Sequence, residues 1–503
     1  MLRILGSRKK LCDGLTRREM LLAGGLGLFG AGLGNSVAVR LARGAPSGGP
    51  PDKNFGQAKS CILLYLYGSP SQIEMCDPKP DAPVEVRGEL ASISTTVAGC
   101  RVNELLPRVA QIMDRVTLVR SMTHSYPIHS ISYALTGLPA TESPLDLNPR
   151  DPRHWPFMGS VVEHFSTQSQ QASSPGGLPN NIALPFPLSS QRPAVKIAGF
   201  QPSFLGNARA PVWPHFNGKA TRRVSRPQFV NSSAYEGPDP YLGIEPDGHF
   251  EIAPRAELGG KITLDRLQRR RSLLEQFNGA QRELDRTSAT SGFNSQRQTA
   301  FALLSSGKVR RALDIRREPR ALRESYGMNL FGQSTLLARR LVEAGCRFVS
   351  VIWDEYGTIN TAWDTHCNHF DRMKNELLPA FDSAFSSLIV DLDSRGMLDD
   401  TLVLVTSEHG RTPQLSDAPG GGRDHWSQCY SNILAGGGIA RGRVVGRSDK
   451  FAASVMDRPV SPKEILCTAY HLLGIDHHAM LTDQQGRPLP VVGAAEVARD
   501  LLA

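Results

Sequence analysis

The most constraining stretch of this 503-residue sequence is Thr401–Thr406 together with the four residues that follow it. Its six residues, TLVLVT, are apolar or β-branched without a break, which is typical of a strand buried on both faces of a parallel sheet. The run stops at Ser407 and is followed by Glu408, His409 and Gly410. Because ligands bind at the carboxyl ends of strands in open α/β sheets, we expect Glu408 and His409 to lie at a functional cleft.

Other segments repeat this pattern of buried strands joined by helices. The runs Ser60–Tyr67, Val116–Arg120 and Arg347–Trp353 predict further buried strands. The segment Met373–Arg395 carries apolar residues at helical spacing and is followed by Gly396, which is typical of a helix C-cap. The alternation predicts an α/β fold with a mostly parallel central sheet.

The chain is long enough to bury a large core, and its composition divides it into a targeting segment, a linker and one large domain. Within the large domain, residues 138–260 are rich in Pro, Gly and Asn and predict an irregular insertion with a short helix at Met158–Phe165. Helical patterning returns over residues 260–318. The predicted boundaries are 1–45 for the targeting segment, 46–59 for the linker and 60–495 for the domain.

The N-terminus has the form of a twin-arginine export signal. Arg17 and Arg18 precede an uncharged, Gly-rich stretch, Met20–Val39. A membrane-anchoring helix is the alternative, but the glycine content makes a poor anchor. We therefore expect a periplasmic or extracellular protein that uses the twin-arginine export machinery, with no stable membrane span after processing.

Most of the net charge of +9 lies in this N-terminal segment. Residues 1–45 hold eight Lys and Arg against Asp13 and Glu19, which leaves about +3 for the rest of the chain. A nucleic-acid-binding protein normally carries a strong basic patch or stripe. The charge distribution therefore disfavours a nucleic-acid partner.

A candidate nucleophile lies where a loop is predicted to enter a helix, over Tyr126–Gly137. A hydroxyl at a helix N-terminus lies where backbone N–H groups and the helix dipole favour an anion. Ser130 is therefore a candidate nucleophile, with His124 or His129 as its base or as a ligand. The alternative is that Ser130 only caps the helix.

Acids and imidazoles follow predicted strands at three separate points in the last third of the chain. One imidazole or carboxylate after a strand would be weak evidence, but three such groups at one sheet edge predict a metal site. The mixed donors suit zinc, manganese or iron, whereas calcium or magnesium would prefer oxygen ligands. A hydrogen-bonded polar network is the alternative. The candidate ligands are Asp364, His366, His369, Glu408, His409 and His425.

Several motifs resemble the alkaline phosphatase and sulfatase superfamily. The strand Thr401–Thr406 and the Glu408-His409 pair after it are similar to the superfamily's metal-binding segment. More closely, the sequence resembles the domain-of-unknown-function family 1501, an exported and largely uncharacterised branch, over roughly residues 60–490. The motifs that carry this resemblance are Ser69-Pro70-Ser71-Gln72, Asp77-Pro78-Lys79-Pro80, Phe331-Gly332-Gln333-Ser334, Trp363-Asp364-Thr365-His366, Ser407-Glu408-His409-Gly410-Arg411-Thr412-Pro413 and Gly422-Arg423-Asp424-His425-Trp426.

The resemblance implies a three-layer α/β/α sandwich of the alkaline-phosphatase type. It also implies a metal-dependent hydrolase of phosphate or sulfate esters, with polysaccharide among the candidate substrates. A catalytically inactive relative, acting outside the cytoplasm as a binding or structural protein, is the alternative. Carried over by position, the pattern gives one metal Asp364, His366 or His369, and His425, and gives a second metal Glu408 and His409.

The sequence departs from the expected pattern in several places. The first strand ends in Tyr67-Gly68-Ser69 where an acidic metal ligand is usual, and the nearest acids are Glu74 and Asp77. The Cys-x-Pro-x-Arg signature that sulfatases convert to formylglycine is missing before Leu135. The missing signature disfavours ordinary sulfatase chemistry. Glu408 stands where Asp is commoner in the superfamily, and His409 stands where Phe is frequent in the family, so one metal is favoured over two.

Overall fold

The computed structural model describes residues 53–126, 131–138, 146–149, 151, 153–168, 178–192, 196–227, 234–252 and 306–503. Residues Asn54–Ala503 form one compact unit. The predicted targeting segment, residues 1–45, and most of the predicted helical segment at 260–318 lie outside the described residues. No helix in the described part of the chain combines the length and the apolar character needed to cross a bilayer.

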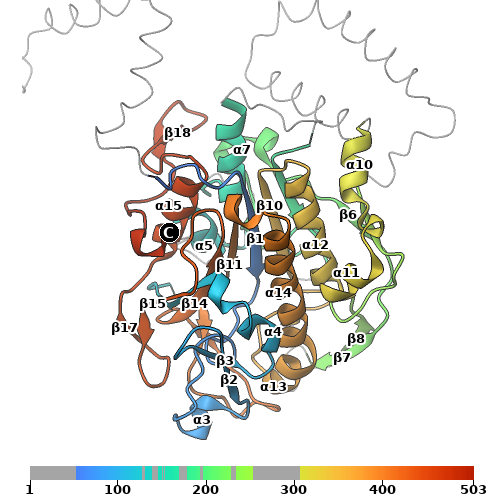
Figure 1. Cartoon of the computed structure of the whole chain (residues 1–503), viewed down its shortest axis with the longest axis vertical. Helices are drawn as coiled ribbons and strands as arrows, with labels where there is room; N and C mark the ends of the chain where they lie inside the picture. Colours follow the sequence, from blue (N-terminus) through green and yellow to red (C-terminus); the bar gives the residue numbers. More distant parts are fainter. Residues whose placement is uncertain are drawn as a thin grey trace, which may run out of the picture. The chain divides into compact units, whose positions relative to one another are not determined.

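A seven-stranded sheet, in the order β15-β4-β14-β11-β1-β10-β5, forms the centre of the unit (Figure 1). In that order the strands are Arg443–Val445, Val116–Met122, Tyr430–Ala435, Thr401–Thr406, Ser60–Leu66, Phe348–Trp353 and Asn181–Leu184. Strand β1 pairs in parallel with both β10 and β11, and β10 pairs in parallel with β5. Only β14 runs antiparallel to its neighbours in this sheet. The predicted mostly parallel sheet is confirmed.

Helices cover both faces of the sheet. Phe348 and Trp353 of β10 are an odd number of positions apart, so their side chains point to opposite faces. Phe348 contacts Phe157, which immediately precedes helix α7 (Met158–Gln168), with ring centroids 6.2 Å apart. Trp353 contacts Phe331 of helix α12 on the other face, at 4.7 Å. The predicted three-layer α/β/α arrangement is therefore confirmed.

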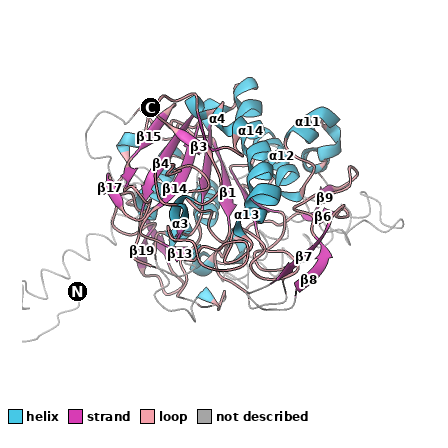
Figure 2. Cartoon of the chain, turned by 90° about the horizontal axis from the view of Figure 1, so that it is seen from below, coloured by secondary structure: helices cyan, strands magenta, loops and turns pink. Residues whose placement is uncertain are grey.

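Two long helices lie together on the α12 side of the sheet. Helix α12 spans Leu330–Glu343 and packs against α14, Leu378–Ser394, and Figure 2 shows the two side by side with α11 (Arg320–Ser325) nearby. The predicted helix at 373–395 is confirmed, but it continues a shorter helical start at residues 369–377. Gly396 has a φ of 65°, as expected of a C-cap glycine.

The predicted irregular insertion at 138–260 contributes more to the core than the sequence indicates. Helix α7 confirms the helix predicted at Met158–Phe165. Strand β5 adds a parallel edge strand to the main sheet, which the sequence analysis missed. Its four residues, NIAL, are too short a run to stand out among the surrounding prolines and glycines. Two antiparallel pairs, β6–β9 and β7–β8, complete the described part of the insertion.

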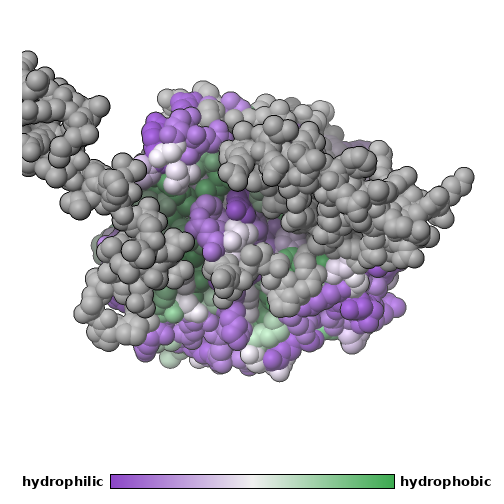
Figure 3. Space-filling model, turned by 90° about the horizontal axis from the view of Figure 1, so that it is seen from above, coloured by the Kyte–Doolittle hydropathy of each residue, from purple (hydrophilic) through white to green (hydrophobic). Residues whose placement is uncertain are grey.

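The remaining elements are short. Helices α5 and α15 pack together, and the capping box at Ser461 and Glu464 fixes the start of α15. Seen from above, the described surface mixes hydrophilic and hydrophobic residues (Figure 3). The bounds are Ile131–Thr136 for α5, Pro462–Leu472 for α15, Val84–Arg87 for α3, Pro107–Ala110 for α4, Gly307–Leu313 for α10, His215–Asn217 for β6, Arg223–Pro227 for β7, Ala234–Pro238 for β8, His249–Glu251 for β9, Ser92–Ser94 for β2, Arg101–Asn103 for β3, Arg447–Ser448 for β16, Val455–Asp457 for β17, Met480–Thr482 for β18 and Pro488–Pro490 for β19.

Candidate metal centre

Two loops and a short ribbon meet beyond the carboxyl ends of the central strands. The loop after β10 leads to Asp364 and His366, and the loop after β11 leads to Glu408 and His409. Strand β12, Gly410–Arg411, then pairs antiparallel with β13, His425–Trp426, so that Arg411 lies opposite His425. The chain thus brings segments some sixty residues apart to one edge of the sheet.

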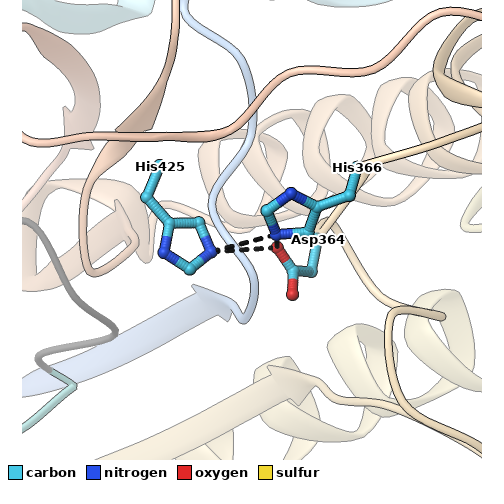
Figure 4. Close-up of side chains that lie close together, drawn as sticks. All are labelled: Asp364, His366 and His425. Carbon is cyan, nitrogen blue, oxygen red and sulfur yellow. Dashed lines mark hydrogen bonds and ion pairs between the residues drawn. The ribbon is translucent and has the colours of Figure 1, made fainter. Parts of the chain in front are cut away.

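Asp364, His366 and His425 converge at this edge. His366 Nε2 lies 3.0 Å from Asp364 Oδ1, and His425 Nε2 lies 3.3 Å from the same oxygen. The two Nε2 atoms are 3.2 Å apart. Figure 4 shows the three side chains pointing toward one another. The side chain of Asp364 is 6% exposed, and those of His366 and His425 are 29% and 22% exposed, so the cluster is accessible from the imidazole side.

The donor set fits a divalent metal. One ligand atom from each of the three residues lies within 4.8 Å of the other two. His366 Nδ1 lies 2.7 Å from Asp424 Oδ1, and a neutral imidazole that donates from Nδ1 keeps its lone pair on Nε2, which faces the cluster. Carboxylates commonly orient metal-binding histidines in this way. Two imidazole nitrogens and one carboxylate oxygen suit zinc or manganese.

The metal-free cluster favours a charged His366. Burial lowers the pKa of His366, but the hydrogen bond and the negative charge of Asp364 outweigh burial and raise the pKa above 6.5. A metal must displace that proton from Nε2. Proton competition at this ligand therefore extends to a higher pH than for an ordinary histidine.

Asp364 also contacts a buried guanidinium. Arg411 Nη2 donates to Asp364 Oδ1 and to the backbone oxygen of Gly68. Its Nε donates to Ser69 O at 3.0 Å, its Nη1 donates to Arg423 O at 3.1 Å, and its side chain is 0% exposed. The carboxylate of the cluster therefore already has a fixed cation beside it.

Glu408 lies beside the cluster as a hydrogen-bond acceptor. Its carboxylate accepts from Tyr65 Oη at 3.0 Å, from the backbone N–H of Gly68 at 2.8 Å and from Ser407 Oγ at 3.1 Å, and the residue is fully buried. These bonds join the ends of β1 and β11. The structure does not bring Glu408 into the three-residue cluster.

His409 contacts the cluster through the ring of His425. Its Nδ1 is 2.7 Å from Gly410 O, and since a carbonyl only accepts, Nδ1 carries the proton. The rings of His409 and His425 have centroids 4.6 Å apart. His409 therefore packs against a cluster member and is not itself grouped with the three converging ligand atoms.

His369 lies in a neighbouring buried group. Its Nε2 is 3.2 Å from Glu74 Oε2 and its Nδ1 is 2.7 Å from Thr365 Oγ1. Glu74 also forms an ion pair with Arg423 at 2.5 Å. Burial raises the pKa of Glu74, but Arg423 and His369 outweigh it and lower the pKa to about 2. Burial lowers the pKa of His369.

The sequence comparison identifies the family. A family model described as a protein of unknown function, DUF1501, matches residues 58–502. The chain belongs to the DUF1501 family. No curated protein matches it.

Solved structures that resemble this DUF1501 chain do so at low identity. The sulfatase PsFucS1 from Pseudoalteromonas sp. has 12% identity and a TM-score of 0.38, over 88% of this chain and 72% of that one. The lipoteichoic acid synthase LtaP from Listeria monocytogenes has 11% identity and a TM-score of 0.33, over 87% and 78%. The phosphonate monoester hydrolase SpPMH from Silicibacter pomeroyi has 12% identity and a TM-score of 0.32, over 88% and 76%.

The catalytic residues predicted for this DUF1501 chain are described only in part. Ser130 and His129 lie outside the described residues, just before α5. His124 Nε2 is 2.8 Å from Glu408 O, and its ring packs edge-on against Tyr133 and Tyr430. Burial lowers the pKa of His124. The structure thus places His124 against the backbone after β11, outside the ligand cluster.

The sequence analysis missed two acids that directly follow β10 in the DUF1501 chain. Asp354 and Glu355 are both buried, and Glu355 forms an ion pair with Arg192. Burial raises the pKa of Glu355 to about 8, although Arg192 opposes the shift, and burial raises the pKa of Asp354 to about 6. Both acids directly follow a buried strand, as Glu408 follows β11, and this position in the sequence could have identified them as candidate site residues.

Proposed function

We propose that this DUF1501 protein is an exported, metal-dependent hydrolase of phosphate or sulfate esters. The observation that carries the proposal is the convergence of Asp364, His366 and His425 at the carboxyl edge of the sheet, with Asp424 orienting His366. Polar groups that converge from distant segments at this edge of an α/β sheet commonly form an active site.

The three proposed ligands would bind one metal ion together. Asp364 Oδ1, His366 Nε2 and His425 Nε2 would hold one divalent cation, with zinc or manganese preferred to calcium or magnesium. Such an ion supplies charge neutralisation for an anionic ester and activates the attacking group. Asp424 keeps the proton of His366 on Nδ1, which presents Nε2 to the ion.

Ser130 is the proposed nucleophile, with His129 or His124 as its base. The support is positional, because Ser130 immediately precedes helix α5, Ile131–Thr136. A serine that only caps α5 remains the competing role. If a Ser130→Ala variant retains full turnover, Ser130 is not the nucleophile and acts only as a helix cap.

The proposed setting is outside the cytoplasm, after export of the folded protein by the twin-arginine route, as Arg17 and Arg18 indicate. The proposed substrate is an anionic ester, with esters on polysaccharides among the candidates. A cation at the sheet edge would attract such a group.

One observation favours a second function, an inactive binding or structural protein. Glu408 follows β11, where the superfamily resemblance places a metal ligand, yet its carboxylate accepts three hydrogen bonds that join strand ends. The end of β1 also lacks an acid, since Tyr67-Gly68-Ser69 stands there. A chain that had lost catalysis could keep such a fold for binding.

Hydrolysis assays on the metal-loaded protein separate the two functions. The protein would be purified without chelator, analysed for metal and screened with aryl phosphates and aryl sulfates. We expect one tightly bound metal and turnover that is lost in Asp364→Asn. Asp399→Asn is the control, because Asp399 is exposed and lies outside the cluster. Bound metal without turnover of either ester class would favour the binding function. Absence of metal would reject both the assignment of the ligands and the proposed hydrolase activity.

A further inference from the structure

Asp364 Oδ1 is shared by three nitrogen atoms of two chemical kinds. Two belong to the half-buried imidazoles of His366 and His425, and the third is Nη2 of Arg411. The imidazoles can exchange a proton for a metal, but a guanidinium stays charged at any physiological pH. The cluster therefore contains one permanent cation and one position at which a second cation can enter.

The guanidinium cannot withdraw from Asp364 without breaking other contacts. Three backbone carbonyls, from Gly68, Ser69 and Arg423, accept its remaining hydrogen bonds. The backbone of Arg411 is also fixed, because Gln72 accepts from its N–H at 2.9 Å and donates to its oxygen at 2.8 Å. Arg411 is thus held on both its side chain and its backbone.

The end of β1 packs closely against Asp364. Gly68 has a φ of +91°, and a Cβ added there would lie 2.4 Å from the backbone nitrogen of Asp364. Only glycine combines that backbone conformation with such a close approach. The end of β1, the carboxylate of Asp364 and the guanidinium of Arg411 therefore form one close-packed junction.

We propose that Arg411 is a permanent cation of the metal centre. Its guanidinium shares Asp364 with the metal, holds the cluster together without metal and weakens metal binding. The metal itself rests on the proposed function. A buried carboxylate without a partner is strongly unfavourable, so Arg411 makes the metal-free cluster stable. The same positive charge competes with the metal for Asp364 Oδ1, which makes the metal exchangeable.

The expected size of this competition follows from the effect of a guanidinium on a carboxylate. A neighbouring arginine typically weakens proton binding to an aspartate by about one to three pKa units. A divalent cation bound to the same oxygen meets the same repulsion. Removing the charge of Arg411 should therefore strengthen metal binding by about tenfold or more.

Zinc titrations of the full chain, with competing chelators, test the sign of this effect. Arg411→Met removes the charge and keeps an unbranched chain, whereas Arg411→Lys keeps the charge. We expect Arg411→Met to bind zinc about tenfold tighter or more, Arg411→Lys to stay near the wild type, and Asp364→Asn to lose the tight site. Zinc should also raise the melting temperature of Arg411→Met more than that of the wild type. Weaker or unchanged zinc binding in a folded Arg411→Met variant would overturn the proposal.

The stability of the metal-free protein tests the pairing of Arg411 with Asp364 separately from metal binding. Urea denaturation of Arg411→Met, Asp364→Asn and the double variant gives the coupling between the two side chains. We expect each single variant to be destabilised and the double variant to lose less than both together, and additive losses would overturn the structural role. If Arg411→Met does not fold, Arg411→Gln takes its place in both experiments. A wild-type chain that binds no zinc, but shows this coupling, would reject the proposed function and the competition while retaining the pairing.

Discussion

Two clusters in the described part of this protein have the same composition, one aspartate and two histidines, and differ in almost everything else. Asp364, His366 and His425 come from loops some sixty residues apart, whereas the second cluster is the tripeptide Asp476-His477-His478. Each brings three potential ligand atoms within 4.8 Å of one another. Strand β18, which follows the tripeptide, lies at the top of Figure 1, away from the end at which the arrow of β1 stops.

The difference lies in the groups that support the ligands. His366 is held by Asp424 and Asp364 by the buried Arg411. In the tripeptide, Asp476 and His478 are exposed. His477 Nε2 lies 3.6 Å from Glu496, whose side chain is 81% exposed. Residue types alone provide the ability to coordinate, but packing and supporting hydrogen bonds provide a fixed geometry.

The largest expected effect separates the two clusters directly. Paired variants, His366→Ala/His425→Ala and His477→Ala/His478→Ala, each remove two imidazoles. We expect the first pair to weaken zinc binding at the proposed site on the order of a thousandfold, because it removes two of the three protein ligands. The second pair should leave that site unchanged. Zinc titration with a chelator of known affinity measures both, and the comparison fails if the two pairs lose the same amount.

The next effect concerns the buried group beneath the central cluster. Glu74→Gln leaves the charge of Arg423 buried without its carboxylate, and we expect the free energy of unfolding at pH 7 to fall by about 3–5 kcal/mol. The matched substitution at the surface cluster, Glu496→Gln, should have no measurable effect on unfolding, because exposed ion pairs contribute little. Urea denaturation at pH 7 measures both.

The pH dependence of this effect has a defined sign. The pKa of Glu74 is lowered from 4.5 to about 2 in the folded protein, so its stabilising contribution is complete above pH 4.5 and is lost as the pH falls toward 2. The difference in stability between wild type and Glu74→Gln should therefore shrink between pH 4.5 and 3. A difference that stays constant over this range would show that folding does not lower the pKa of Glu74.

The sequence predicted the centre of the fold better than its edges. The long unbroken apolar runs of β1, β10 and β11 were recognisable because both faces of these strands are buried. Strand β14, with the sequence YSNILA, mixes polar and apolar residues, and β5 is only four residues long. Such strands are specified by their neighbours in the sheet, which a local pattern does not contain.

At the candidate site, too, the sequence identified the residue types but not their long-range partners. Asp364, His366 and His425 were all among the predicted ligands, since acids and imidazoles after strands stand out. The sequence could not separate His366 from His369, three positions away, because the distinction depends on partners far along the chain. Asp424, 58 positions away, orients His366, whereas Glu74 contacts His369 from the loop after β1. Long-range pairing of this kind leaves no local signal.

The smallest expected effect tests whether orientation, and not only the ligand atoms, distinguishes the two clusters. Asp424→Asn keeps the size of the side chain but removes the charge that accepts the proton of His366 Nδ1. Because the Asp424 side chain is 70% exposed, its loss should leave the unfolding free energy nearly unchanged. Zinc binding at the proposed site should nevertheless weaken by about 10–100-fold, as is usual when an outer hydrogen bond to a metal ligand is lost. Glu496→Gln, the matched change beside His477, should leave that site as it is. Equal zinc affinity in Asp424→Asn and wild type would mean that packing against His425 alone orients His366, and the contrast between the clusters would then rest on burial.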